Sequence, residues 1–187
     1  MPIRARQHDT YPADLLDQPA DAPESVHAWW AIYTLSRREK ALMDHLLRWE
    51  IPYYSPLIKR KSRSPSGRKR ESWLPLFPGY VFLRGNEEHR YLALKSNCVS
   101  RTLRVADGVQ LVHDLRQIQR LIASGAPLSP ESRLQPGTRV RVRTGPLTGL
   151  EGVVIRRRGR DQLLVAVTFL QQGASIAIED FLVEPIV

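Results

Sequence analysis

The proline- and serine-rich stretch from Ser124 to Ser132 constrains the fold most, because it separates two parts of the chain that have different patterns. The stretch is poor in core residues, which is typical of an extended linker. A chain of 187 residues has room for one medium domain and one small domain. We therefore predict a first domain over 28–123, a flexible linker over 124–134 and a second domain over 135–187.

The first 27 residues are rich in Asp, Pro and Ala and show no sustained apolar periodicity. Such a segment buries too little surface to offset the entropy lost on ordering, so we predict a disordered tail over 1–27. The segment lacks the apolar block of a signal peptide, and no run in the chain approaches the roughly 18 apolar residues of a membrane span. We expect a cytoplasmic protein.

Strand-like and helix-like segments alternate in the first domain. Ser36 and Glu39 have the spacing of a capping box, which predicts the start of a helix. Leu42, Leu46 and Trp49 follow at helical spacing and are expected to pack in the core. The expected elements are a strand over 28–35, a helix from 36 to before Ile51, strands over 53–58, 80–83 and 99–105, and a helix over 111–122.

Short valine-rich segments separated by Gly or charged turns fill the second domain, a pattern typical of a small β-barrel. A helical hairpin is the alternative, and the β-branched residues disfavour it. The expected strands are Val140–Val142, 153–155, 163–167, 176–178 and 182–187. The fold class is therefore α+β, with helices covering an antiparallel sheet, followed by a small barrel.

The net charge of +9 and pI near 10.2 favour a polyanionic partner. The charge is concentrated in the first domain, around a hairpin whose turn is Ser64–Gly67. Two interpretations stay open: the hairpin binds nucleic-acid phosphates, or it is a solvated hairpin, because its basic run contains no aromatic residue. The basic residues of the run are Lys59, Arg60, Lys61, Arg63, Arg68, Lys69 and Arg70.

Sequence patterns that carry catalysis or metal binding do not occur in the chain. The single cysteine, Cys98, excludes an intrachain disulfide and is expected to be a buried, inert thiol. The five histidines lack zinc spacing, and neither a phosphate-binding glycine loop nor a nucleophile with its base is recognisable. We predict a protein that is not an enzyme and holds no metal or cofactor.

Two separated motifs carry a family resemblance. The segment Pro75–Phe82 (PLFPGYVF) resembles the signature of the NusG N-terminal domain, and Trp29–Tyr33 (WWAIY) matches the opening of that domain. The segments Pro136–Val142 and Gly145–Val154 resemble a KOW motif. Together they identify the chain as similar to NusG-family factors, and the resemblance implies a NusG N-terminal α/β sandwich followed by an SH3-like KOW barrel.

The resemblance also implies where partners bind. In the family, an apolar patch of the first domain docks on the clamp helices of the largest RNA polymerase subunit. The matching positions are Tyr33, Phe77, Pro78, Gly79 and Tyr80, with Leu103 nearby. Tyr33 and Phe77 can instead be ordinary core aromatics, the more frequent role of such residues, but the resemblance favours the interface.

Further candidate positions are His89 and two turns of the second domain. His89 lies where RfaH-like relatives carry a His-Thr-Thr stretch that touches the opposite pincer of the polymerase, but Arg90 and Tyr91 replace the threonines. The turn Arg156–Arg160 is either solvated or meets RNA or an acidic partner. Three glycines are expected in tight KOW turns: Gly145, Gly149 and Gly152.

The expected function is transcription elongation. As the resemblance implies, the factor binds the polymerase clamp, suppresses pausing and promotes antitermination, and we favour a specialised paralogue serving specific operons. The alternatives are a housekeeping NusG that couples polymerase to Rho or the ribosome, and a ribosome-associated KOW protein that binds RNA. The expected partners are polymerase, non-template DNA, and Rho, a ribosomal protein or nascent RNA at the second domain of a monomer.

Overall fold

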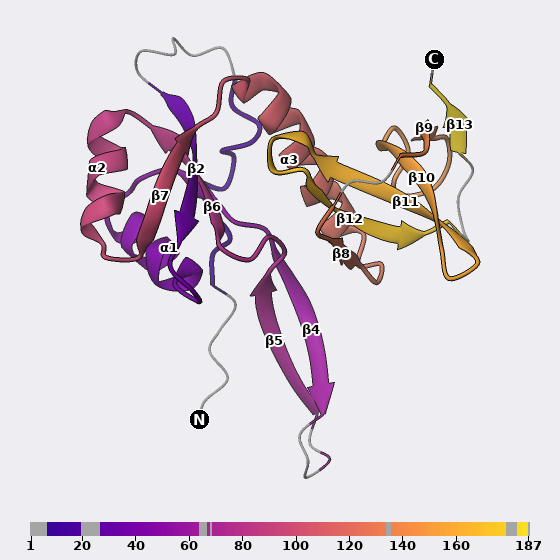
Figure 1. Cartoon of the computed structure of the whole chain (residues 1–187), viewed down its shortest axis with the longest axis horizontal. Helices are drawn as coiled ribbons and strands as arrows, with labels where there is room; N and C mark the ends of the chain where they lie inside the picture. Colours follow the sequence, from indigo (N-terminus) through magenta and orange to yellow (C-terminus); the bar gives the residue numbers. More distant parts are fainter. Residues whose placement is uncertain are drawn as a thin grey trace. The chain divides into compact units, whose positions relative to one another are not determined.

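The computed structural model describes residues 7–19, 27–63, 67, 69–133, 136–178 and 183–186. The chain forms two compact units, Met1–Gly108 and Val109–Val187. The first unit combines helices with antiparallel strands, and the second is built mainly of antiparallel strands (Figure 1). The chain is therefore mixed α and β, as its alternating patterns predict.

The first unit contains a five-stranded sheet in the order β1-β3-β6-β2-β7, in which every neighbouring pair is antiparallel. The central strands are the aromatic run and the segment after the Pro78-Gly79 turn, which confirms both strand predictions. The strands are β1 (Thr10–Tyr11), β2 (Ala28–Thr34), β3 (Tyr53–Tyr54), β6 (Tyr80–Gly85) and β7 (Val99–Arg104).

Helices α1 (Glu39–Arg48) and α2 (Glu87–Lys95) pack on the same face of this sheet (Figure 1). Trp30 and Ile32 of β2 form one buried cluster with Leu42 and Leu46 of α1, while Trp29, Ala31 and Tyr33 alternate to the opposite face. Cys98 is buried in the same cluster, as expected.

Helix α2 was not predicted, because its mixture of charged and apolar residues has no strong apolar stripe. The signal for it is local. Asn86 is the N-cap residue, and its side chain accepts a hydrogen bond from the His89 amide at 2.9 Å. Glu87 and Glu88 add negative charge to the first turn, where it stabilises a helix.

Two expectations for α1 are wrong. The capping box does not form, since the N-cap residue is Arg38 and no side chain caps the helix. Trp49 does not join the core: the helix ends at Arg48, and Trp49 is 39% exposed and stacks on His45 with 5.1 Å between ring centroids. The helical spacing of apolar residues in the sequence therefore extends one residue beyond the end of the helix.

Part of the N-terminal segment is ordered, contrary to the expected disordered tail. Strand β1 pairs with β3, and Leu15 and Leu16 are buried, with 1% and 2% exposure. The composition of residues 7–19 did not indicate this order, because the segment gains its stability from a sheet edge formed by residues about forty positions later.

Strands β4 (Leu57–Arg63) and β5 (Lys69–Pro75) form a separate two-stranded sheet, the expected basic hairpin. The expected strand over 53–58 is interrupted at Ser55 and Pro56, because the chain leaves the five-stranded sheet there. Turn residues 64–66 and Arg68 lie outside the described residues, as does the Arg70 side chain.

The division of the chain falls after the first residue of α3 (Gly108–Ala123) rather than after the helix. The helix is bonded within the second unit: the Thr168 amide donates to Asp114 Oδ2 at 2.8 Å, and Arg120 donates to the Thr148 carbonyl. A six-stranded antiparallel sheet follows in the order β13-β9-β10-β11-β12-β8. Its elements are β8 (Ser129–Glu131), β9 (Thr138–Val142), β10 (Glu151–Arg157), β11 (Arg160–Val167), the 3-10 turn η1 (Thr168–Leu170), β12 (Gln172–Ala177) and β13 (Val183–Pro185).

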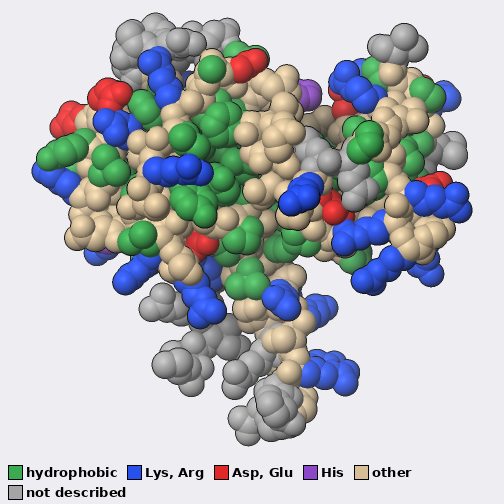
Figure 2. Space-filling view, viewed as in Figure 1, with side chains coloured by type: hydrophobic (Ala, Val, Ile, Leu, Met, Phe, Trp, Pro, Cys, Tyr) green, Lys and Arg blue, Asp and Glu red, His purple; other side chains and the backbone are tan. Residues whose placement is uncertain are grey.

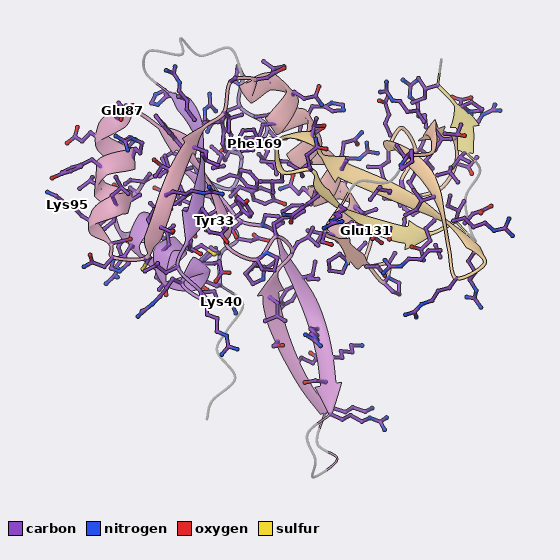
Figure 3. All side chains as sticks on the ribbon, viewed as in Figure 1. Tyr33, Lys40, Glu87, Lys95, Glu131 and Phe169 are labelled. Carbon is purple, nitrogen blue, oxygen red and sulfur yellow. The ribbon has the colours of Figure 1, made fainter. Side chains whose placement is uncertain are left out.

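Strand β8 lies within the expected flexible linker and instead pairs with β12. Glu131 of β8, labelled in Figure 3, is 7% exposed, accepts a hydrogen bond from Ser175 Oγ at 2.7 Å and forms an ion pair with Arg157. A buried carboxylate needs such partners. Three residues of the predicted linker, Ser129–Glu131, are thus a strand of the second unit, which the proline content of the linker did not indicate.

Candidate functional site

Tyr33 lies at the end of β2, where three strands meet. It is opposite Tyr80 on β6 and opposite Arg101 on β7, and all three side chains share the sheet face away from α1 (Figure 3 labels Tyr33). The two tyrosine rings meet edge to face with centroids 5.2 Å apart, and Arg101 Cζ lies 5.1 Å from the Tyr33 ring centroid. The ring is half-buried and held in place, which suits a preorganised contact.

Gly79 fixes the turn beside Tyr33. Its φ of +85° is in the left-handed region, and a Cβ on it would lie 3.1 Å from Tyr33 Cε2. The Gly79 carbonyl accepts a hydrogen bond from the Thr34 amide at 2.8 Å. The turn therefore needs glycine both for its backbone angle and for its close approach to the aromatic ring.

Glu39 holds the other side of the turn. Its Oε1 accepts a hydrogen bond from the Gly79 amide at 2.7 Å, and the side chain is only 8% exposed. The carboxylate thus connects the start of α1 to a turn forty residues later, instead of capping its own helix. Hydrogen bonds to a charged group are among the stronger ones in proteins.

Phe77 is 1% exposed, so the expectation that the turn presents its ring is wrong. The Tyr80 amide donates to the Phe77 carbonyl at 3.1 Å, which closes the turn and leaves Pro78 exposed. Burying a phenyl ring stabilises the fold by roughly 1.5–3 kcal/mol, whereas leaving the smaller proline ring in solvent forgoes less free energy of burial. Phe77 is a core aromatic, which is the alternative that the sequence left open.

Leu103 joins the Tyr33 face, and His89 does not. Leu103 is half-buried on β7 opposite Ala31, two residues along the strand from Arg101. His89 packs against Gly85 at the far end of β6, about 17 Å along the strand from Tyr80. Its Nδ1 is buried and has no hydrogen-bond partner among the described residues.

We call the described side chains that share the Tyr33 face at this end of the sheet the tyrosine patch: Tyr33, Tyr80, Arg101 and Leu103. On the face shown in Figure 2, hydrophobic side chains gather over the sheet of the first unit, with Lys and Arg side chains around them. Arg101 was missed by sequence reasoning, because only the cross-strand register brings it to Tyr33.

The basic hairpin has two faces, set by its register. Lys59 pairs with Trp73, Lys61 with Glu71 and Arg63 with Lys69, so these side chains share one face, while Arg60 lies on the other. The described basic side chains of the hairpin are exposed, and Lys and Arg side chains follow it in Figure 2. Four of them, Lys59, Lys61, Arg63 and Lys69, form one basic face.

Glu71 is the acidic residue of that face. It forms an ion pair with Lys59 at 2.7 Å, and the Lys59 hydrogen bond together with the Lys59 and Lys61 charges lowers the pKa of its carboxyl. Glu71 therefore stays ionised and offsets part of the basic charge. Trp73 is the aromatic that sequence reasoning did not connect with the run; it is half-buried against the core of the first unit.

The glycines of the second unit have two different roles. Gly145 and Gly149 adopt φ values of +85° and +81° in the turn between β9 and β10, as expected. Gly152 lies inside β10 and not in a turn, which corrects the prediction. A Cβ on Gly152 would lie 2.5 Å from the Leu164 carbonyl oxygen, so glycine is needed there for close strand approach.

The turn between β10 and β11 carries exposed arginines. Arg158 and Gly159 have positive φ values of 50° and 76°, and Arg156 is exposed beside them. Arg157 is engaged with Glu131, and Arg160 has a partner as well. The cations of this turn therefore divide between structural contacts and solvent-facing positions.

Metal-binding geometry does not occur within the described ranges: no group of three or more His, Cys, Asp or Glu side chains is placed to hold an ion. Likewise, none of the helices in the described part of the chain is long and apolar enough to cross a membrane.

The fold defines a two-unit protein, with one mixed α/β unit followed by one unit built mainly of antiparallel strands. The particular family follows from comparison: the family model described as "Transcription termination factor nusG" matches residues 27–131, more than half of the chain. The chain belongs to the NusG family, whose members are non-enzymatic transcription factors that bind RNA polymerase. A search of curated proteins returned no match.

Proposed function

We propose that the chain is a transcription elongation factor whose tyrosine patch docks on the clamp helices of the largest RNA polymerase subunit. The observation that supports this most is the fixing of Tyr33 by Tyr80, Arg101 and the Gly79 turn, because rigid aromatics with little entropy left to lose make strong interface contacts. Pro78 is exposed beside the patch and extends the contact.

Docking stabilises the closed clamp around DNA, which suppresses pausing and promotes antitermination. The effect is a coupling free energy between clamp closure and factor binding, with no chemical step. The hairpin contributes a second contact: its basic face binds phosphates of the non-template DNA near the transcription bubble. This factor acts in the cytoplasm as a monomer.

A specialised role on particular operons, similar to that of RfaH-like relatives, is favoured over a housekeeping role by the surface of α2. Tyr91 is 55% exposed and lies under Lys95 Nζ, 4.6 Å from the ring centroid, where relatives carry a threonine. Arg90 is occupied by Glu87 at 2.6 Å, by Thr102 and by the Trp30 ring. This different surface offers His89 a modified contact with the opposite pincer.

The second unit is proposed to be an SH3-like KOW barrel that recruits Rho, a ribosomal protein or nascent RNA. Two features support this: the paired left-handed glycines at 145 and 149, and the exposed arginines of the β10–β11 turn. The second candidate function, ribosome-associated RNA binding, is favoured by the same arginine turn alone.

A polymerase pull-down tests the proposal. Tyr33→Ala, checked for folding, is expected to lose binding to core polymerase, whereas Trp49→Ala, an exposed aromatic just after α1, is the matched control and keeps it. Phe77 is left unchanged because its removal would disturb the core. If neither the native chain nor the control variant binds polymerase, and the native chain co-sediments with ribosomal subunits instead, the proposed polymerase function is replaced by the ribosomal one.

A further inference from the structure

The basic hairpin is a separate two-stranded sheet, so its direction depends on how its root is held. At the root, the Leu76 amide donates to the Pro56 carbonyl at 2.8 Å, next to the first strand pair Leu57 and Pro75. Pro56 follows Ser55, which connects the hairpin to the short strand β3. Any element that fixes Ser55 and β3 therefore also fixes the start of the hairpin.

Residues 7–19, which we call the strap, are such an element. Thr10 and Tyr11 pair with Tyr54 and Tyr53, and the Ser55 amide donates to the Asp9 carbonyl at 2.7 Å. The strap precedes residues 27–131, which the family model matches. Strand β3 is only two residues long and has β1 on one side and β6 on the other.

The strap is anchored at both ends. At its start, the buried Tyr53 hydroxyl donates to the His8 carbonyl at 2.8 Å, and Gln7 Nε2 donates to the Lys40 carbonyl of α1 at 2.8 Å. At its other end, Leu15 and Leu16 are buried. These contacts hold a segment whose composition alone would leave it unfolded.

Arg84 of β6 completes the second anchor. Its guanidinium is nearly buried, at 6% exposure, and donates to Gln18 Oε1 at 3.2 Å and to the Pro19 carbonyl at 2.8 Å. A buried cation is costly unless its donors are satisfied, and the strap supplies these acceptors. The strap is thus bonded to the rest of the first unit at both its first and its last described residue.

We infer that the strap positions the basic hairpin and thereby sets how many of its cations reach nucleic-acid phosphates at once. This inference rests on the proposed phosphate contact of the hairpin. A loosened strap leaves every hairpin charge in place but lets the hairpin root move, so fewer cations of the basic face engage one backbone together.

The test uses the intact chain with Leu15→Ala/Leu16→Ala, which removes the apolar anchor without changing any charge. Leu15→Met/Leu16→Met is the matched control, because it conserves side-chain volume. If the alanine variant does not fold, Tyr53→Phe replaces it, since that change removes only the bond to the His8 carbonyl and keeps the ring.

The first readout is independent of nucleic acid. Spin labels at Ser62→Cys on the hairpin and Ser100→Cys on β7, both exposed sites, report the hairpin position, and the native Cys98 is buried. We expect a broader distance distribution in the alanine variant and an unchanged one in the methionine control. An unchanged distribution in the alanine variant overturns the inference, whatever the DNA result.

The second readout is the binding of a short labelled DNA duplex at several salt concentrations. The alanine variant is expected to bind about five- to ten-fold more weakly, with a slope of log K against log salt smaller by about one to two. Unchanged DNA binding despite a broadened distribution overturns the inference. If the variant Lys61→Gln/Arg63→Gln binds DNA as tightly as the native chain does, the proposed phosphate contact of the hairpin is wrong. The spin-label distances distinguish this result from a failure of the strap to position the hairpin.

Discussion

The contact between Glu39 and Gly79 provides the sharpest prediction, because one buried carboxylate holds the turn against which Tyr33 packs. Glu39→Ala removes an acceptor 2.7 Å from the Gly79 amide and leaves that half-buried amide without its partner. A hydrogen bond to a charged group is worth about 1.5–3 kcal/mol, so the amide should lose about ten- to hundred-fold of its protection against hydrogen exchange.

Hydrogen exchange measured by NMR on the intact chain checks this prediction residue by residue, which avoids a single unfolding free energy for two units. Glu39→Gln is the matched control: it keeps an oxygen acceptor without charge, so its loss of protection should be intermediate. Since Gly79 contacts the Tyr33 ring, polymerase binding should weaken in the same order. Unchanged Gly79 protection in Glu39→Ala would refute the assigned role.

Three further predictions concern Gly152, Glu71 and Tyr53. Gly152→Ala should destabilise the second unit by about 3 kcal/mol, because the added Cβ meets a backbone carbonyl. Gly149→Ala has open space around it and should cost only about 1 kcal/mol, from its left-handed φ. Equal shifts of the thermal unfolding temperature in the two variants would contradict this prediction. Glu71→Gln should tighten DNA binding and steepen its salt slope by up to about 0.9, because it frees Lys59; anisotropy titrations that match the native chain would rule this out. Burial, with smaller contributions from the Asp44 and Asp9 carboxylates, raises the pKa of Tyr53 in the folded chain. Above about pH 10, Tyr53 therefore ionises in the unfolded chain but not in the folded one. The free energy of unfolding should then fall by up to about 1.4 kcal/mol per pH unit. Tyr53→Phe should abolish that alkaline fall in denaturation experiments, and its persistence would show that another group causes it.

Local periodicity predicted several elements well. The aromatic run gave β2, the stripe of Leu42 and Leu46 gave α1, and the valine-rich segments gave the strands of the second unit. These patterns succeed because a strand or helix is decided by which faces of a short segment are apolar. Helix α2 escaped because its stripe is weak, although Asn86 and the acidic residues after it carry a capping signal.

The candidate site was only partly predictable. Tyr33 and the Pro78-Gly79 turn could be placed from motifs, and the register confirms that Tyr33 and Tyr80 lie together. Other features depend on strand pairing, which the motif does not contain. These are the burial of the Phe77 ring, the approach of Arg101 to Tyr33 and the position of Trp73 opposite Lys59.

Local patterns in the sequence were enough to predict the two-part organisation, the family, the basic hairpin and the glycines that turn between β9 and β10. Three contacts could not be predicted from local patterns: Glu39 bonds to a turn forty residues away, Arg84 bonds to a strap 65 residues before it, and Glu131 of the predicted linker is buried in a sheet. The difference lies in the distance along the chain over which each interaction acts. Propensity, capping and turn chemistry act over a few residues, whereas burial and pairing depend on which distant segments the fold brings into contact.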